Sequence, residues 1–479
     1  MKTEKPEGIS RRSFLKGGAV LGGVMAGAGG LRAYASPADT SSKELRLRIG
    51  ILSDTHLDNS EPPAQKLKRA LETFRKGRVD GVLICGDLAD HGVVPQLEEL
   101  ARIWEEVFPG SKGVDGSHVE RLFHYGDHDN GGYAHRGDNV LKRYGWTEAE
   151  RNGNAIFHHP KEAWERIFKE PWSPITHKQV KGYDFVLSHH MRERGNDAAG
   201  LEEFFDGFKP DPARPFFFSK HRVLRNTVCG PCVWGQDNGK VGRVLSSYPN
   251  CCAFCGHSHQ TAAREDSIWQ GAFTAVQVPS LRYVTQENGH DNKPNGYAAE
   301  QGMILNVYDD MMSIRRIDFA NGRLLGPTWD VPLGGKAMPY ERETRRRAAP
   351  VPEFPSEAKL AAAVEETAGK DGNREKTLVL EFPVVSGLRG GVRAYDYEIT
   401  VDAVCFGGDA ARIVRRFFSP KCHFAPSAED AAMKVEVPLD GFKKWNALNG
   451  RGRGALHVAV RPREIFGGLG RALEADVSS

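Results

Sequence analysis

The sequence predicts a layered α/β domain followed by a small antiparallel β-sandwich. Between residues 45 and 320, short apolar runs typical of buried strands alternate with segments of helical spacing. From residue 377 onward, runs of alternating apolar and polar residues predict antiparallel strands. The chain of 479 residues is also longer than one hydrophobic core usually supports, so we expect at least two domains.

The first 35 residues are typical of an export signal. Residues 10–16 read S-R-R-S-F-L-K, an apolar Gly/Ala-rich run follows at 17–31, and Ala33 and Ala35 are the small residues that a signal peptidase needs. The paired arginines indicate the twin-arginine pathway, so we expect a periplasmic or extracellular protein. The apolar run is short for a membrane span of about 20 residues, and no later segment is long enough either.

The formal charge shows no bias toward an anionic partner. The whole chain carries +3, but six basic and two acidic residues lie within 1–35, so the remainder carries −1. The sequence therefore predicts neither nucleic acid nor an anionic membrane as a partner.

The elements of the first domain, which we place at 45–332, follow from these patterns. The predicted strands lie at 45–53, 79–85, 119–125, 183–188, 215–220, 251–255, 273–278, 303–308 and 313–319. The predicted helices lie at 64–76, 95–108, 160–169, 199–208 and 239–248. A long insert at about 129–180 is rich in Gly, Asn, Trp and His. Its His135, Trp146, His158 and His159 could shape a substrate pocket or be exposed loop residues.

Composition changes after residue 332. Residues 333–373 are rich in proline and charge, with R-R-R at 345–347, and we expect a linker there. We expect residues 374–479 to form the β-sandwich, which resembles fibronectin type III modules, notably at 457–470.

Acidic and histidine side chains recur directly after the predicted strands. They are Asp54 and His56 after the first strand, Asp87 after the second, Asp127 and His128 after the third, and His257 and His259 after the strand at 251–255. Because ligands of α/β sheets bind beyond the carboxyl ends of the strands, we expect these groups to converge. Burying them together without a cation would be costly, so the pattern predicts a metal centre.

These motifs resemble those of calcineurin-like metallophosphoesterases over about residues 45–320. The matching segments read S-D-T-H (53–56), C-G-D-L-A-D (85–90), Y-G-D-H-D (125–129) and C-G-H-S-H (255–259). The resemblance implies a four-layer αββα sandwich and a dinuclear hydrolase of small phosphate mono- or diesters. Two metal ions, which could be Mn, Fe or Zn, would activate a bridging hydroxide for in-line attack on phosphorus.

The resemblance also implies the role of each residue. The first metal would be bound by Asp54, His56, Asp87 and His259. Asp87 would bridge to a second metal, bound also by Asp127, His257 and one further histidine. His128 would lie beside the phosphate as an acid or a charge stabiliser.

The further histidine has two candidates. His189 and His190 follow the strand at 183–188 directly, whereas the family's ligand follows a strand-helix-strand unit, which ends here at His221. Residues 226–227, 247–249 and 267–271 also resemble an exported bacterial branch in which the histidine before such a segment is the ligand. We therefore predict His221 as the ligand, and His189 or His190 could still line the pocket.

Asp127 departs from the family pattern, which has asparagine at this position. A carboxylate remains a good ligand for a hard cation. Its extra negative charge should reduce the Lewis acidity of the second metal, so we expect lower activity or an altered metal preference.

Two other functions compete with this prediction. C-G-P-C at 229–232 is the dithiol motif of thioredoxin-like proteins, although a structural disulfide or a pocket loop is the simpler interpretation. A metal- or phosphate-binding protein without turnover is the other alternative. Of the remaining cysteines, Cys85 is expected to be a buried thiol, and Cys405 and Cys422 could pair.

Overall fold

The structure is a computed structural model. It describes residues 44–129, 160–190, 200–230, 233–287, 294–334, 337–368, 374–385, 392–404, 410–418, 432–439 and 455–478. The predicted signal peptide and the four insert residues His135, Trp146, His158 and His159 lie outside these ranges. No helix of the described residues is long and apolar enough to cross a membrane.

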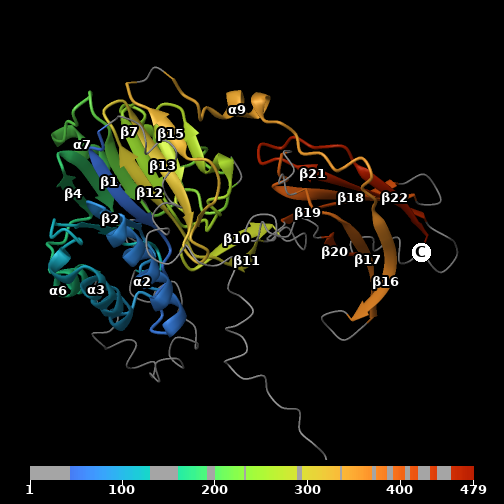
Figure 1. Cartoon of the computed structure of the whole chain (residues 1–479), viewed down its shortest axis with the longest axis horizontal. Coiled ribbons are helices and arrows are strands. Elements are labelled where there is room, and N and C mark those ends of the chain that lie inside the picture. Colours follow the sequence, from blue (N-terminus) through green and yellow to red (C-terminus); the bar gives the residue numbers. More distant parts are fainter. Residues whose placement is uncertain are drawn as a thin grey trace, which may run out of the picture.

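Two mixed sheets form the N-terminal part of the molecule (Figure 1). In the first sheet, the order is β14-β13-β12-β1-β2-β3, and β15 also pairs with β13. Its strands are β1 (Leu47–Leu52), β2 (Gly81–Cys85), β3 (Glu120–His124), β12 (Gln301–Val307), β13 (Met311–Asp318), β14 (Arg323–Leu324) and β15 (Trp329–Pro332). β1, β2 and β3 run parallel, whereas β12 pairs antiparallel with β1.

The second sheet has the order β4-β5-β6-β7-β9-β8. Its strands are β4 (Ile175–Val180), β5 (Tyr183–Ser188), β6 (Phe216–Lys220), β7 (Cys251–Cys255), β8 (Ile268–Gln270) and β9 (Thr274–Gln277). The four central strands are parallel, and an antiparallel strand closes each edge. Buried side chains of both sheets, including Ile49, Phe217 and Leu305, share one core between them.

Helices cover the outer face of each sheet, which completes four layers. α2 (Glu61–Lys76), α3 (Val94–Val107) and α6 (Pro160–Phe168) pack on the first sheet, and α7 (Leu201–Gly207) and α8 (Lys240–Leu245) pack on the second. α2 buries Leu67, Leu71 and Phe74 at helical spacing, as an amphipathic helix must. The predicted αββα architecture is therefore confirmed.

The C-terminal part consists of two further antiparallel sheets (Figure 1). Their orders are β16-β17-β20 and β19-β18-β21-β22. The strands are β16 (Ala361–Ala368), β17 (Arg374–Pro383), β18 (Asp396–Val404), β19 (Ala410–Phe418), β20 (Ala432–Pro438), β21 (Ala455–Arg463) and β22 (Leu473–Ser478). Leu380 of β17 and Val458 of β21 belong to one buried cluster, so the two sheets enclose a common core.

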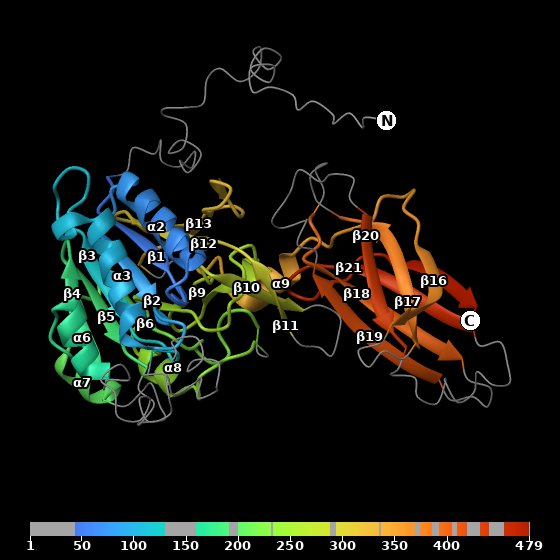
Figure 2. The same cartoon turned by 90° about the horizontal axis from the view of Figure 1, so that it is seen from below.

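The structure differs from the sequence prediction in several elements, of which three matter most. β4 lies inside the predicted insert, where its partly exposed polar residues hid an edge strand. β10 (Tyr283–Glu287) and β11 (Pro294–Ala298) form an unpredicted hairpin that lies between the two parts of the molecule (Figure 2). The linker expected at 333–373 contains helix α9 (Arg342–Ala348) and strand β16, because backbone pairing with β17 extends the C-terminal sheet to residue 361.

Candidate metal centre

The predicted acidic and histidine residues lie in loops that follow strands of both sheets. Asp54 and His56 follow β1, Asp87 follows β2, and their loops are joined by backbone hydrogen bonds. The Asp54 N–H donates to the carbonyl of Gly86 (3.1 Å), and the His56 N–H donates to the carbonyl of Asp87 (3.0 Å). The other loops follow β3, β6 and β7 and carry Asp127, His128, His221, His257 and His259.

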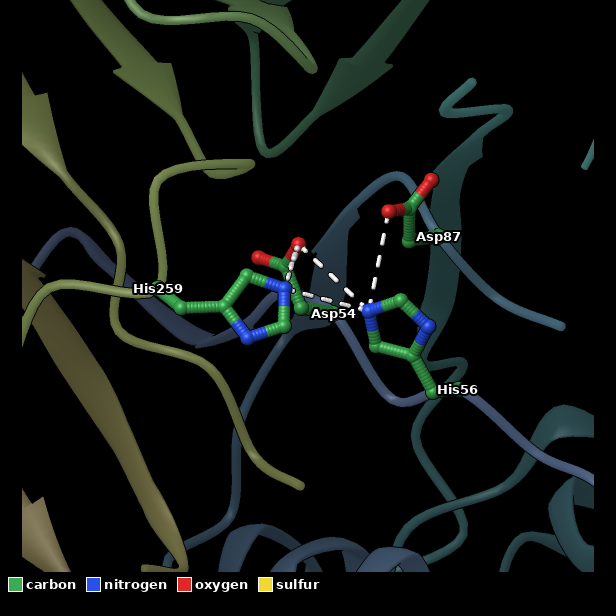
Figure 3. A group of neighbouring side chains, drawn as sticks. All are labelled: Asp54, His56, Asp87 and His259. Atoms are coloured by element: carbon green, nitrogen blue, oxygen red, sulfur yellow. Dashed lines mark hydrogen bonds and ion pairs between the residues drawn. The ribbon is translucent and has the colours of Figure 1, made fainter. Parts of the chain in front are cut away.

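A first group of four buried residues combines Asp54, His56, Asp87 and His259 (Figure 3). The Nε2 atom of His259 lies 3.1 Å from Asp54 Oδ1, and His56 Nε2 lies 3.6 Å from Asp87 Oδ2. The two Nε2 atoms are 3.1 Å apart. One ligand atom from each residue lies within 4.8 Å of the others, which is close enough for a shared cation.

A second group combines Asp87 with Asp127, His221 and His257. His221 Nε2 lies 3.1 Å from Asp87 Oδ2 and 3.0 Å from Asp127 Oδ1. His257 Nδ1 lies 3.1 Å from the same oxygen of Asp127. Asp87 is therefore common to both groups, in the position that a bridging carboxylate would occupy.

The donor atoms fit two cations. Asp127 Oδ1 is buried, and one nitrogen each of His221 and His257 lies 3.0 Å and 3.1 Å from it. Carboxylate oxygens and imidazole nitrogens converge there from several loops, and these are ligand types of Mn, Fe and Zn. The described residues thus offer two sets of four donors that share Asp87.

The electrostatics of the groups agree with a cationic occupant. Burial favours the neutral form of the Asp54 carboxyl, but His259, His221 and His56 outweigh it and lower its pKa. Burial likewise opposes the charged form of His221, but Asp87, Asp127 and Asp54 raise its pKa well above the ordinary value. The carboxylates therefore attract positive charge, and bound metal ions would replace the protons on the histidines.

Polar contacts at Nδ1 orient three of the histidines with Nε2 toward the centre. His221 Nδ1 lies 2.8 Å from the carbonyl of Cys85, and His259 Nδ1 lies 3.1 Å from the carbonyl of Tyr283. His56 Nδ1 lies 3.2 Å from Asp90 Oδ1. A carbonyl or carboxylate at Nδ1 is the usual partner of a metal-binding imidazole, because it fixes the tautomer and ring orientation.

The backbone is strained at the same place. Five of the seven predicted ligands have positive φ angles, which non-glycine residues rarely adopt. The angles are 51° for Asp54, 42° for His56, 50° for Asp87, 68° for His257 and 51° for His259. Such clusters of strained residues are typical of functional sites, where the surrounding structure stabilises them.

Glycines next to the ligands allow close packing. A Cβ at Gly86 would lie 2.6 Å from His221 Nδ1, and a Cβ at Gly126 would overlap the Asp87 carboxylate. The glycine of each Gly-Asp pair is thus required by its neighbour across the centre.

His128 and Asp129 extend the site. The His128 backbone N–H donates to Asp87 Oδ1 (3.0 Å), and its Nδ1 lies 2.7 Å from the carbonyl of Asp90. Asp129, which the sequence prediction omitted, accepts hydrogen bonds from the N–H groups of Leu88 (3.0 Å), Ala89 (2.8 Å) and Gly126 (2.7 Å). Asp129 therefore ties the loop after β3 to the loop after β2. In the sequence, only its position two residues after Asp127 indicated that Asp129 could belong to the site.

The structure separates the two candidate histidines. His221 lies in the second group, whereas His189 is buried among the rings of Tyr125, Trp164 and Trp172. His189 Nδ1 accepts a hydrogen bond from the Tyr125 N–H (3.1 Å), and the next residue, His190, donates its backbone N–H to the Tyr125 carbonyl (3.0 Å). His189 thus belongs to the packing beneath the loop that carries Asp127.

Two aromatic side chains that the sequence prediction did not single out flank the centre. The indole of Trp234 stacks on His257, with ring centroids 4.6 Å apart. The ring of Tyr283 lies against His259, with centroids 4.4 Å apart. Neither residue belongs to a motif, so only the three-dimensional structure brings them to the site.

The five cysteines that the structure describes do not resemble a redox site. Cys85, Cys229, Cys251, Cys252 and Cys255 are buried free thiols. Burial raises the pKa of Cys229 to about 12, whereas a reactive thiol needs a lowered pKa. The other cysteines, Cys232, Cys405 and Cys422, lie outside the described residues.

Comparisons with known proteins agree with the fold and the export signal. Residues 47–261 match the calcineurin-like phosphoesterase family, so the chain contains a domain of this kind. Residues 8–28 match the twin-arginine translocation signal, which indicates export by that pathway. No curated protein matches the chain in sequence.

Several solved structures are similar to part of this chain at low sequence identity. GAP50, the anchor in the inner membrane complex of Plasmodium, is 12% identical, with 61% of this chain and 90% of that chain covered and a TM-score of 0.38. A dimetal phosphatase from Danio rerio is 11% identical, with 61% and 100% covered and a TM-score of 0.35. A predicted phosphoesterase from Streptococcus pneumoniae is 12% identical, with 60% and 97% covered and a TM-score of 0.26.

Proposed function

We propose that the calcineurin-like phosphoesterase domain of this protein hydrolyses phosphate mono- or diesters with two metal ions. One observation carries the proposal. Asp87 Oδ2 lies 3.6 Å from His56 Nε2 of the first group and 3.1 Å from His221 Nε2 of the second. A carboxylate shared between two buried donor sets suits a dinuclear centre, and the family match supports the reaction class.

The proposed ligands follow from the two groups. Asp54, His56, Asp87 and His259 would bind one ion, and Asp87, Asp127, His221 and His257 would bind the other. Such a pair of Mn, Fe or Zn ions supplies Lewis acidity to a phosphoryl group and lowers the pKa of water, so that hydroxide is available near neutral pH.

The chain's own residues would position the reaction. Strained loops and Nδ1 hydrogen bonds fix the donor atoms before substrate arrives, which lowers the reorganisation needed during catalysis. His128 is the proposed acid. Its Nδ1 lies 2.7 Å from the Asp90 carbonyl and its ring packs edge-on against His56, so the proton transfer to the leaving group is assigned to Nε2.

The domain limits form part of the same proposal. We assign the catalytic domain to residues 45–332 and the following β-sandwich to a separate domain that begins at β16. The Arg264 guanidinium donates to the Tyr395 hydroxyl (3.2 Å) and lies over the same ring. This contact favours a structural role for the sandwich, which packs beside the catalytic domain.

The test is metal analysis combined with a panel of mono- and diester substrates. We expect about two ions per purified chain and metal-dependent hydrolysis. His221→Ala should lose one ion and lower kcat/KM by about 10² or more, the scale for removal of one charge-stabilising group. His189→Ala is the matched control, because it removes a buried histidine outside both groups, and it should keep both ions. The reverse pattern would overturn the assignment of His221, and metal binding without any turnover would favour a binding protein.

A further inference from the structure

An exposed tryptophan lies at the edge of the proposed metal centre. Trp234 is 57% exposed, the largest value among the large apolar side chains that the structure describes. Its indole plane is inclined by only 20° to the His257 imidazole, with centroids 4.6 Å apart. One face of the indole therefore covers a proposed metal ligand, while the rest of the ring is accessible beside it.

The loop holds Trp234 in this position through its neighbours. Gly235 has a φ of 80°, and a Cβ there would overlap the His257 ring, so the backbone passes directly against that ring. Gln236 Oε1 accepts from the Asn226 N–H (2.8 Å), and Asp237 pairs with the buried Lys220 ammonium (2.8 Å). Burial of the indole does not fix this loop, so packing alone gives no reason for a large apolar ring here.

The other half of the centre has a similar aromatic side chain. Tyr283 is 37% exposed, and its ring lies 4.4 Å from that of His259. Its backbone carbonyl also lies 3.1 Å from His259 Nδ1. Each half of the centre thus combines a ligand histidine with an adjacent, accessible aromatic ring.

We propose that Trp234 is a specificity-determining residue that stacks on a planar ring in the leaving group of the substrate. The protein therefore prefers phosphate esters of aryl alcohols or nucleosides to esters of aliphatic alcohols. This inference rests on the proposed function. Stacking suits the geometry, because an indole with one face on His257 can take a second flat ring in an offset arrangement, and such contacts tolerate different ring systems.

The test compares Trp234→Leu, which removes the ring, with Trp234→Phe, which keeps one. The measured quantity is the ratio of kcat/KM for phenyl phosphate to that for glycerol phosphate. The ratio should fall about tenfold in Trp234→Leu and recover in Trp234→Phe. A second measurement uses non-hydrolysable probes. Calorimetry should show that phenylphosphonate loses its affinity advantage over methylphosphonate in the same variant.

The outcomes separate this inference from the proposed function. If Trp234→Leu lowers both kcat/KM values equally and loses metal, Trp234 only supports His257 and the inference is wrong. If the protein cleaves no ester but phenylphosphonate binding still depends on Trp234, the proposed function fails and the ring site remains. A larger effect with adenosine 5′-monophosphate than with phenyl phosphate would assign the ring to a nucleobase; the opposite order would assign it to a simple aryl group.

Discussion

The two halves of the proposed metal centre are built differently. The half with Asp54, His56 and His259 is buried, and backbone hydrogen bonds connect the loops after β1 and β2. The half with Asp127, His221 and His257 is more open, since the Asp127 side chain is 26% exposed. One backbone hydrogen bond, from the Gly256 N–H to the His221 carbonyl (2.8 Å), joins its loops after β6 and β7, and the buried Lys220–Asp237 ion pair adds a side-chain anchor.

This difference implies that the first half of the centre is the more rigid one and that the second half can vary. Main-chain geometry fixes the first half, so changes of side chains around it should alter its shape little. The second half depends in addition on a buried ion pair, and it carries Asp127 in place of the family's asparagine and Trp234 over His257. We therefore expect activity and specificity to be set in the second half.

The largest effect is expected where the halves meet. Asp87→Asn removes the shared carboxylate, so both ions should be lost and kcat/KM should fall by about 10³ or more. Metal content per chain and kinetics measure this, with the exposed Asp115→Asn as the control. Retention of one ion at full occupancy would show that the halves bind metal independently.

A smaller effect is expected from breaking the ion pair that anchors the second half. Asp237→Asn removes the carboxylate paired with buried Lys220 and should lower the free energy of unfolding by about 3–5 kcal/mol. Because Lys220 precedes His221, the second ion should weaken first in a metal titration. Glu106→Gln breaks the exposed pair with Lys68 and should lower the free energy of unfolding far less, because water and salt screen an exposed ion pair. Equal losses in urea unfolding would contradict this view of the second half.

The smallest effect concerns the charge of the second half. Asp127→Asn removes one negative charge, so the second ion should bind more weakly and become a stronger Lewis acid. We expect changes of about tenfold or less in metal affinity and a rise in kcat. Metal-dependent kinetics at saturating substrate measure both. Complete loss of activity would instead mean that the anionic oxygen is essential here.

The sequence predicted the fold and the convergence of the site because both depend on local patterns. Apolar strands can be recognised from the sequence. Residues directly after them, such as Asp54 and His257, meet at one edge of an α/β fold. The backbone strain at these residues was not readable, because it requires dihedral angles rather than spacing.

The elements and residues that were missed depend on tertiary contacts. β4 is an edge strand with polar residues, so its pattern resembles a loop. Trp234 follows a sequence segment with glycine and cysteine and no periodicity. Only the structure shows that its ring lies against that of His257. Similarly, Asp129 accepts hydrogen bonds from three N–H groups that lie in two different loops, so its role depends on how these loops pack together.

The position of β1 in its sheet has a consequence for synthesis. β1 lies between β2 and β12, and Ile49 pairs with both Gly81 and Leu305. β1 therefore lacks its β12 partner until residue 307 has left the ribosome, roughly 15–60 s after initiation at ordinary elongation rates. During this interval one edge of β1 is unpaired. Asp54 cannot contact His257 and His259 until these residues have also been synthesised. The proposed metal centre is therefore incomplete until that moment, and export of the folded chain cannot begin earlier.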